Sequence, residues 1–170
     1  KVFTTRPDTL YGVSYLVLAP EHPLVDQLTS IEQKKQVNEF QSMVAATSEQ
    51  DRLADDRPKS GVALGGMVQH PITKEALPVW IADYVLPDYG TGAVMGVPAH
   101  DERDFSFALK YNLSIKTVVV PANPIAADDQ PVTNINSEPS SAYTELGLLI
   151  NSAEFNGMVG EEAKKAIIDK

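Results

Sequence analysis

A cluster of hydroxyl and charged residues, Thr4-Thr5-Arg6-Pro7-Asp8-Thr9, directly follows the apolar pair Val2-Phe3. Hydroxyl groups donate and accept hydrogen bonds and a carboxylate attracts cations, so this threonine segment suits the wall of a small polar pocket. Neighbouring residues of a strand point to opposite faces, so a bulge or a strand end would be needed for Thr4 and Thr5 to reach one cavity. The alternative is a β-branched strand end followed by an Asx turn at Asp8.

A second segment, residues 90–104 (GTGAVMGVPAHDERD), joins a glycine-framed apolar strand to the charged start of a helix. Asp101 and Asp104 are three residues apart, which puts both carboxylates on one helix face near its positive end. Carboxylates in that position stay ionised and suit the binding of a ligand ammonium group. The alternative is that Asp101 or His100 caps the helix and Asp104 is a surface charge that compensates the helix dipole.

Other catalytic templates fit this sequence poorly. The absence of cysteine excludes disulfides, thiolate catalysis and cysteine-bound zinc. A single histidine near Asp101 and Asp104 is a weak metal signal, and no phosphate-binding, dinucleotide-binding or serine-elbow motif is present. We therefore expect neither a metal ion nor a cofactor.

The elements that must position these residues are short strands with helices between them, which predicts an α+β domain and allows a β-barrel. The hydrophobic periodicity predicts a helix that begins after an N-cap at Ser30, and carboxylates favour another at Asp101. We expect strands at Val2–Thr4, Val13–Leu18, Val62–Val68, Pro78–Leu86, Ala93–Val97 and Ile115–Val120, helices at Ile31–Ala45, Asp101–Tyr111 and Val159–Ile168, and a surface excursion at Pro121–Ser141.

Composition and charge limit the possible partners. The chain has 170 residues, 14 basic against 23 acidic side chains and a net charge of −9, which argues against gripping long nucleic acid through phosphates. No apolar stretch approaches the ~20 residues that a membrane helix requires, so we expect no membrane association and a cytoplasmic setting. The chain starts inside a motif and without methionine, so we expect one domain over residues 1–170 excised from a larger protein.

The two segments resemble the editing domain of leucyl-tRNA synthetase, a class I aminoacyl-tRNA synthetase. Further motifs stand in the order of that family, and the resemblance spans roughly residues 1–115: residues 4–12 (TTRPDTLYG), 21–23 (EHP), 70–73 (HPIT), 78–86 (PVWIADYVL) and 90–104. The isoleucyl and valyl enzymes resemble it less, because they typically have Trp in the threonine segment and lack the His-Asp-x-x-Asp sequence.

The resemblance implies a β-barrel core with peripheral helices and a hydrolytic proofreading reaction. One hydrophobic pocket discriminates a methylene by only about 1–3 kcal/mol, and synthetases are the standard example of adding a second, hydrolytic sieve. The implied substrate is the 3′-terminal adenosine of tRNA(Leu) carrying a noncognate amino acid such as norvaline or isoleucine. Water would cleave the ester without a covalent intermediate, while leucine is excluded sterically.

The resemblance also assigns roles residue by residue. Thr4 and Thr5 are implied to bind the ester, its oxyanion or the attacking water, Asp104 to bind the α-ammonium group, and Thr9 to crowd out leucine. The other residues implied in substrate binding are Arg6, Asp8, Leu86, Tyr89, Met95, Val97, His100 and Asp101. Among these, Tyr89 and the Leu86 backbone would contact the adenosine, Met95 and Val97 would line the pocket, and Arg6 and Asp8 would shape it.

Two alternatives stay open. The chain could hold the tRNA 3′ end without hydrolysing the ester, or it could be the editing domain of an isoleucyl or valyl relative. In each case the rest of the parent synthetase would bind the remaining tRNA, and a monomer is the simplest expectation.

Overall fold

The computed structural model describes residues 1–54, 57–122 and 139–170, and the chain divides into two compact units. The first unit consists of Lys1–Thr4 and Ser14–Gly96, and the second of Thr5–Val13 and Val97–Lys170. The chain therefore passes from one unit to the other at Thr5, at Ser14 and at Val97. Most of the predicted excursion at Pro121–Ser141 lies outside the described residues.

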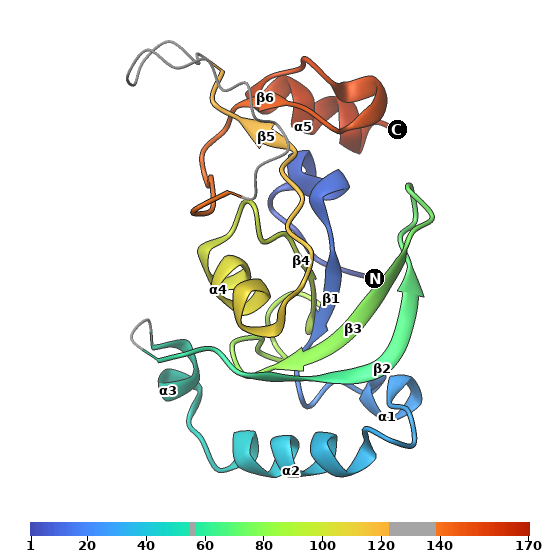
Figure 1. Ribbon diagram of the computed structural model, residues 1–170, viewed down its shortest axis with the longest axis vertical. Coiled ribbons are helices and arrows are strands. Elements are labelled where there is room, and N and C mark those ends of the chain that lie inside the picture. The colour runs from blue at the N-terminus through green and yellow to red at the C-terminus, as the bar shows by residue number, and fades with distance from the viewer. Residues whose placement is uncertain (55–56, 123–138) are drawn as a thin grey trace. The chain divides into compact units, whose positions relative to one another are not determined.

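The first unit contains a four-stranded sheet with the order β2-β3-β1-β4 (Figure 1). Its strands are β1 (Tyr15–Leu18), β2 (Gly61–Gln69), β3 (Ala76–Ala82) and β4 (Ala93–Gly96). β1 runs parallel to β3, whereas the β1–β4 and β2–β3 pairs are antiparallel. The expected Val2–Thr4 strand is reduced to a single bridge from Phe3 to Val94.

The expected closed barrel is not confirmed. Closing a barrel requires the two edge strands to pair with each other. In the described residues β2 pairs with β3 and β4 with β1, and the remaining two strands, β5 (Val119–Val120) and β6 (Leu148–Leu149), form a separate sheet. The architecture of the described chain is therefore mixed α+β with open sheets.

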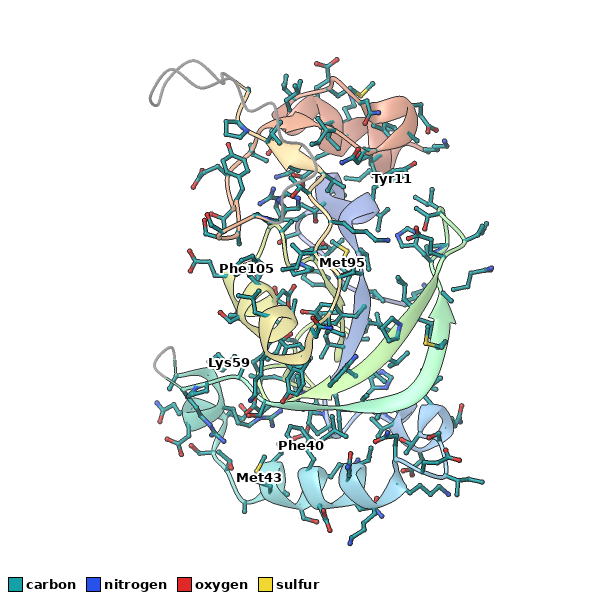
Figure 2. All side chains as sticks on the ribbon, in the orientation of Figure 1. Tyr11, Phe40, Met43, Lys59, Met95 and Phe105 are labelled. Atoms are coloured by element: carbon teal, nitrogen blue, oxygen red, sulfur yellow. The ribbon has the colours of Figure 1, made fainter. Side chains whose placement is uncertain are left out.

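Helix α2 (Lys34–Ala45) covers β2 with the apolar face predicted from the sequence. Val37, Phe40 and Val44 are buried in one cluster with residues of the sheet, and Figure 2 shows Phe40 between helix and sheet. The predicted start after Ser30 is wrong, because the N–H of Ser30 donates to Leu64 and its carbonyl accepts from Gln33 in a turn before the helix. Two shorter helices, α1 (Val25–Leu28) and α3 (Glu49–Leu53), flank α2 in the chain.

The second unit is built around α4 (Glu102–Tyr111) and α5 (Gly160–Ile168), with 3₁₀-helices η1 (Pro7–Gly12) and η2 (Ala153–Phe155). Leu149, Phe155, Ala163 and Ile167 are buried together, and Leu10 and Tyr11 of η1 pack against them. The residues of η1 that follow the threonine segment thus pack on the cluster that includes α5, which the sequence did not indicate. The predicted last helix is confirmed to within one residue.

Several predicted strands are shorter than expected: β1 begins at Tyr15 rather than Val13, and β4 ends at Gly96 rather than Val97. Only Val119–Val120 of the predicted Ile115–Val120 strand pairs, and β3 ends at Ala82 rather than Leu86. β3 ends there because Asp83 turns out of the sheet: its N–H donates to Ser60 O, and its carboxylate accepts from Ser60 N at 2.9 Å. Within the described ranges, none of the helices has the length and apolar character needed to cross a membrane.

Candidate functional site

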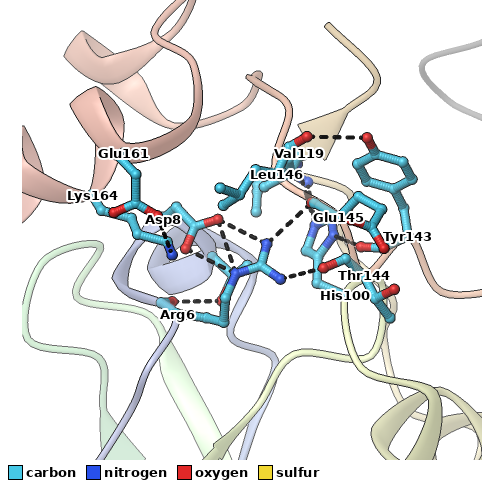
Figure 3. Close-up of polar contacts among 12 residues, drawn as sticks. Arg6, Asp8, His100, Val119, Tyr143, Thr144, Glu145, Leu146, Glu161 and Lys164 are labelled. Atoms are coloured by element: carbon cyan, nitrogen blue, oxygen red, sulfur yellow. Dashed lines mark hydrogen bonds and ion pairs between the residues drawn. The ribbon is translucent and has the colours of Figure 1, made fainter.

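Arg6 and Asp8 form a hydrogen-bonded ion pair at the start of η1 (Figure 3). The guanidinium donates from Nε to Asp8 Oδ1 at 3.0 Å and from Nη2 to Asp8 Oδ2 at 2.8 Å. It also donates to the carbonyls of Thr144 and Glu145, far along the chain. The pair therefore fastens the segment Tyr143–Leu146, which we call the strap, to the threonine segment.

Thr9 is buried on η1, and its hydroxyl donates to the carbonyl of Arg6 at 2.9 Å. Because the hydroxyl hydrogen is used within the protein, the part of Thr9 suited to act on a ligand is its methyl group. Thr5, just before η1, is exposed. These two residues of the threonine segment therefore differ: Thr9 offers bulk, and Thr5 offers a hydroxyl group near solvent.

Both ring nitrogens of His100 bind the backbone. Nδ1 lies 3.0 Å from the carbonyl of Tyr143 in the strap, and Nε2 lies 3.0 Å from Val118 N and 3.2 Å from Val119 N. Since an amide N–H can only donate, Nε2 must be the unprotonated acceptor and Nδ1 the donor. Burial lowers the pKa of His100, the carbonyl of Tyr143 opposes that shift, and the charges of Arg6 and Asp8 act in opposite directions.

This bonding gives His100 a structural role in joining three stretches of backbone. Its part in substrate binding stays a prediction. Both ring nitrogens already bind backbone groups. The close approach of η1 is also visible at Gly12, where an added Cβ would lie 2.8 Å from Val118 Cγ2 and 3.6 Å from His100 Cδ2.

Asp101 is the N-cap of α4, as one alternative reading of the sequence predicted. Its side chain accepts from the backbone N–H groups of Arg103 at 2.9 Å and Asp104 at 3.1 Å. The cap satisfies donors that the first helical turn leaves without partners.

The surface-charge alternative for Asp104 is wrong, because this residue is only 5% exposed. Its Oδ2 accepts a hydrogen bond of 2.9 Å from the N–H of Val97, seven residues earlier in the chain. A buried carboxylate is stable only with hydrogen-bond or charge partners. Asp104 thus combines a structural bond with the negative charge that an ammonium group would require.

The remaining predicted residues belong to the first unit. Thr4 is exposed, Leu86 and Met95 are half-buried, and Tyr89 is 54% exposed. The rings of Tyr89 and Phe3 pack in a T-shaped arrangement, with centroids 5.6 Å apart and planes at 89°. Tyr89 therefore has a packing partner although more than half of the residue is open to solvent.

The structure gathers most of the predicted site residues into one unit although they come from distant parts of the sequence. The members in the second unit are Thr5, Arg6, Asp8, Thr9, Val97, His100, Asp101 and Asp104, and those in the first are Thr4, Leu86, Tyr89 and Met95. The convergence of Thr4, Thr5, Thr9 and Asp104 on one cavity stays a prediction. In the described ranges, no group of three or more His, Asp and Glu side chains is arranged to hold a metal ion.

Sequence reasoning missed the strap and the buried Arg52 of α3. The strap acts through its backbone carbonyls, and side-chain identity carries no signal for such contacts. Arg52 stands in a highly charged stretch from which nothing distinguishes it by type. The only hint was the Glu21-His22-Pro23 motif, which resembled the family but had no assigned role.

Comparison with known proteins settles the family. The family described as "Leucyl-tRNA synthetase, editing domain" matches residues 1–170. The chain belongs to this family. The match includes residues 121–170, beyond the part in which the sequence motifs were specific.

Curated relatives agree with this assignment to the leucyl group. Leucine–tRNA ligase of Synechococcus sp. strain RCC307 is 65% identical over 168 residues, covering 99% of this chain and 18% of the relative. Leucine–tRNA ligase of Acaryochloris marina is 57% identical over 169 residues, covering 99% of the chain and 19% of the relative. This editing-domain sequence therefore spans less than a fifth of the length of these relatives.

A solved structure has a similar fold. It is described as the ternary complex of Agrobacterium radiobacter K84 agnB2 LeuRS-tRNA-LeuAMS, with a TM-score of 0.60 and 36% identity. The similarity covers 79% of this chain and 16% of that one.

Proposed function

We propose that this chain hydrolyses the aminoacyl ester of mischarged tRNA(Leu), such as norvalyl- or isoleucyl-tRNA(Leu), after transfer of the amino acid. The observation that carries the proposal is the buried Asp104 carboxylate, in the same compact unit as Thr9 and in a member of the leucyl editing family. The α-ammonium group of the esterified amino acid would pair with Asp104, whose position near the N-terminus of α4 favours an ionised carboxylate.

The reaction would need no covalent intermediate. Water adds to the ester carbonyl carbon, the bond to the ribose oxygen breaks, and that oxygen takes up a proton as the amino acid leaves. An aminoacyl ester is already activated, so positioning of water and stabilisation of the oxyanion supply much of the rate. The exposed hydroxyls of Thr4 and Thr5 are suited to these tasks.

Leucine would be excluded by the bulk of Thr9. The hydroxyl of Thr9 is already bonded to Arg6, so its methyl group would do the excluding. Met95 and Val97 would line the pocket, and Tyr89 with the Leu86 backbone would contact the terminal adenosine. Arg6, Asp8, His100 and Asp101 would shape the site, in keeping with their bonds to neighbouring backbone or to each other.

The parent synthetase would bind the rest of the tRNA, because a chain with net charge −9 is poorly suited to holding a polyanion by itself. A monomeric domain over residues 1–170 in a cytoplasmic enzyme completes the proposal.

The direct test measures deacylation of isoleucyl-tRNA(Leu) by a leucine–tRNA ligase that carries this chain as its editing domain. Asp104→Asn retains an oxygen that can accept from Val97 N–H but removes the charge, so we expect kcat/KM to fall about 100-fold or more. Asp104→Glu keeps the charge and should retain more activity than Asp104→Asn. Normal hydrolysis by Asp104→Asn would contradict the ammonium role.

The same assay separates hydrolysis from binding alone. If the unsubstituted chain binds mischarged tRNA and leaves the ester intact, the alternative of a non-hydrolytic 3′-end module is correct.

Steric exclusion of leucine is tested by two opposite changes at Thr9. Thr9→Ser removes the methyl group and can keep the bond to Arg6, so it should hydrolyse correctly charged leucyl-tRNA(Leu) about tenfold faster or more. Thr9→Val keeps the bulk, loses the bond and should still spare leucine. The reverse pattern would show that the hydroxyl rather than the methyl group protects leucine.

A further inference from the structure

Arg52 of α3 is a buried cation outside the predicted site. Its side chain is only 4% exposed, and each of its donor groups is used. Nε donates to the carbonyl of Asp83 at 2.8 Å, Nη2 to the carbonyl of Val85 at 2.8 Å, and Nη1 to Glu21 Oε1 at 2.8 Å. Burying a guanidinium is costly unless it is bonded, and these three bonds offset that cost.

The two carbonyls belong to the loop that connects β3 to β4, residues 83–92. This stretch contains no strand or helix, so its backbone groups have no sheet partners. Arg52 binds the carbonyls of Asp83 and Val85 at the start of this loop, and Leu86 comes directly after them. Further along the loop, Tyr89 N donates to Leu86 O. The start of the loop that carries both expected adenosine contacts is therefore held by Arg52 together with the bonds between Asp83 and Ser60.

The far end of the same loop is tied to the turn that contains Glu21. Ala19 N donates to Gly92 O at 2.8 Å, and His22 N donates to Ala19 O at 2.9 Å. His22 packs closely there, since a Cβ added to Gly92 would lie 3.3 Å from His22 Cδ2. The turn of residues 19–22 thus contacts both ends of the loop, through Glu21 and Arg52 at one end and through Ala19 at the other.

We propose that Arg52 is a positioning residue for adenosine recognition: with Glu21 it helps to fix the loop 83–92 so that the half-exposed ring of Tyr89 is presented to the nucleobase. This inference rests on the proposed function. Tyr89 suits such a task because its ring packs against Phe3 while 54% of the residue stays exposed. Base stacking on an aromatic ring requires a fixed ring plane, and its loss typically weakens binding by about fivefold or more.

The test uses a leucine–tRNA ligase that carries this chain as its editing domain, with isoleucyl-tRNA(Leu) as substrate. Arg52→Lys keeps the positive charge but loses the fork that reaches two carbonyls and Glu21 together. We expect its KM to rise about fivefold or more, as for lost stacking, with kcat within about twofold of the unsubstituted value. Arg57→Lys is the matched control, since among the described residues Arg57 makes only long contacts, with the Asp83 carboxylate at 3.9 Å and the Asp51 carbonyl at 3.5 Å.

A double-substitution cycle distinguishes positioning from general support of the fold. If Arg52 acts through Tyr89, Arg52→Lys should raise KM little further in a Tyr89→Ala background. If Arg52 only supports the fold in general, the effects of the two substitutions should be additive. An unchanged KM in Arg52→Lys, or a fall in kcat with KM unchanged, would overturn the inference. Absence of hydrolysis by the unsubstituted chain would instead contradict the proposed function, so the two failures are distinguishable.

Discussion

Arg6 in the second unit and Arg52 in the first bind their surroundings in the same way but with opposite burial. Each guanidinium donates to two backbone carbonyls and to one carboxylate. In the Arg6–Asp8 pair the arginine side chain is 23% exposed and the carboxylate 3%, whereas in the Arg52–Glu21 pair the arginine is 4% exposed and the carboxylate 43%. The difference lies in which charge water can reach.

This contrast indicates where each region is vulnerable. Removing one member of a buried pair is costly mainly because the other charge is left without compensation. Without Arg6, the buried Asp8 loses its cation, whereas without Arg52 the half-exposed Glu21 is solvated by water. The less buried arginine should therefore matter more for stability.

The largest expected effect is that of Arg6→Met. We expect it to destabilise the second unit by about 3 kcal/mol, because Asp8 stays buried as an uncompensated anion. Arg52→Met should cost about 2 kcal/mol in the first unit, through lost hydrogen bonds from a charged donor. Hydrogen exchange of peptides from the two units, within the ligase that carries this chain, measures both losses.

A control variant tests the reason for that order. Adding Asp8→Asn to Arg6→Met removes the buried charge and should restore part of the lost protection. If Arg52→Met proves the more damaging single change, burial of the arginine rather than of its counterion decides the cost.

The next effect is a pH dependence of the stability of the second unit. It arises at His100, which binds the same strap as Arg6. Burial lowers the pKa of His100, so below about pH 6.5 the unfolded chain takes up a proton that the folded chain resists. By linkage, stability of the second unit should be full above that pH and should decline as the pH falls below it. Arg6 and Asp8 are the charged groups facing the ring, and their contributions to the pKa oppose each other.

His100→Gln offers the comparison for this dependence. Glutamine can still accept from Val118 or Val119 but does not titrate. The stability advantage of histidine, measured by hydrogen exchange at about pH 7.5 and about pH 5.5, should shrink at the lower pH. An advantage that is the same at both values would show that folding does not change the pKa of His100.

The smallest expected effect is that of Glu21→Gln. A half-exposed ion pair contributes about 1 kcal/mol or less, and Arg52 keeps its two carbonyl partners. We expect protection of the first unit to change by no more than that amount in the same exchange experiment. A loss as large as that of Arg52→Met would show that Glu21 is needed to hold the guanidinium in place.

Local features were predictable because they depend on neighbouring residues. Asp101 caps α4, the apolar stripe of α2 faces the sheet, and α5 begins within one residue of its predicted start. The helix expected after Ser30 starts later because the backbone of Ser30 bonds to Leu64, a residue distant in the chain. The predicted end of β3 was wrong for the same reason, because the bonds between Asp83 and Ser60 join residues distant in the chain.

The sequence by itself determined the family, through motifs of side chains that keep their order and spacing, and it determined the helix caps, which depend on residues a few positions apart. Only the tertiary structure decided that Asp104 is buried, that His100 is committed to the backbone, and that Arg52 holds the loop 83–92. Each of these depends on hydrogen bonds to carbonyl or amide groups remote in sequence. Every residue carries such backbone groups, so residue type alone cannot reveal which of them the fold brings together.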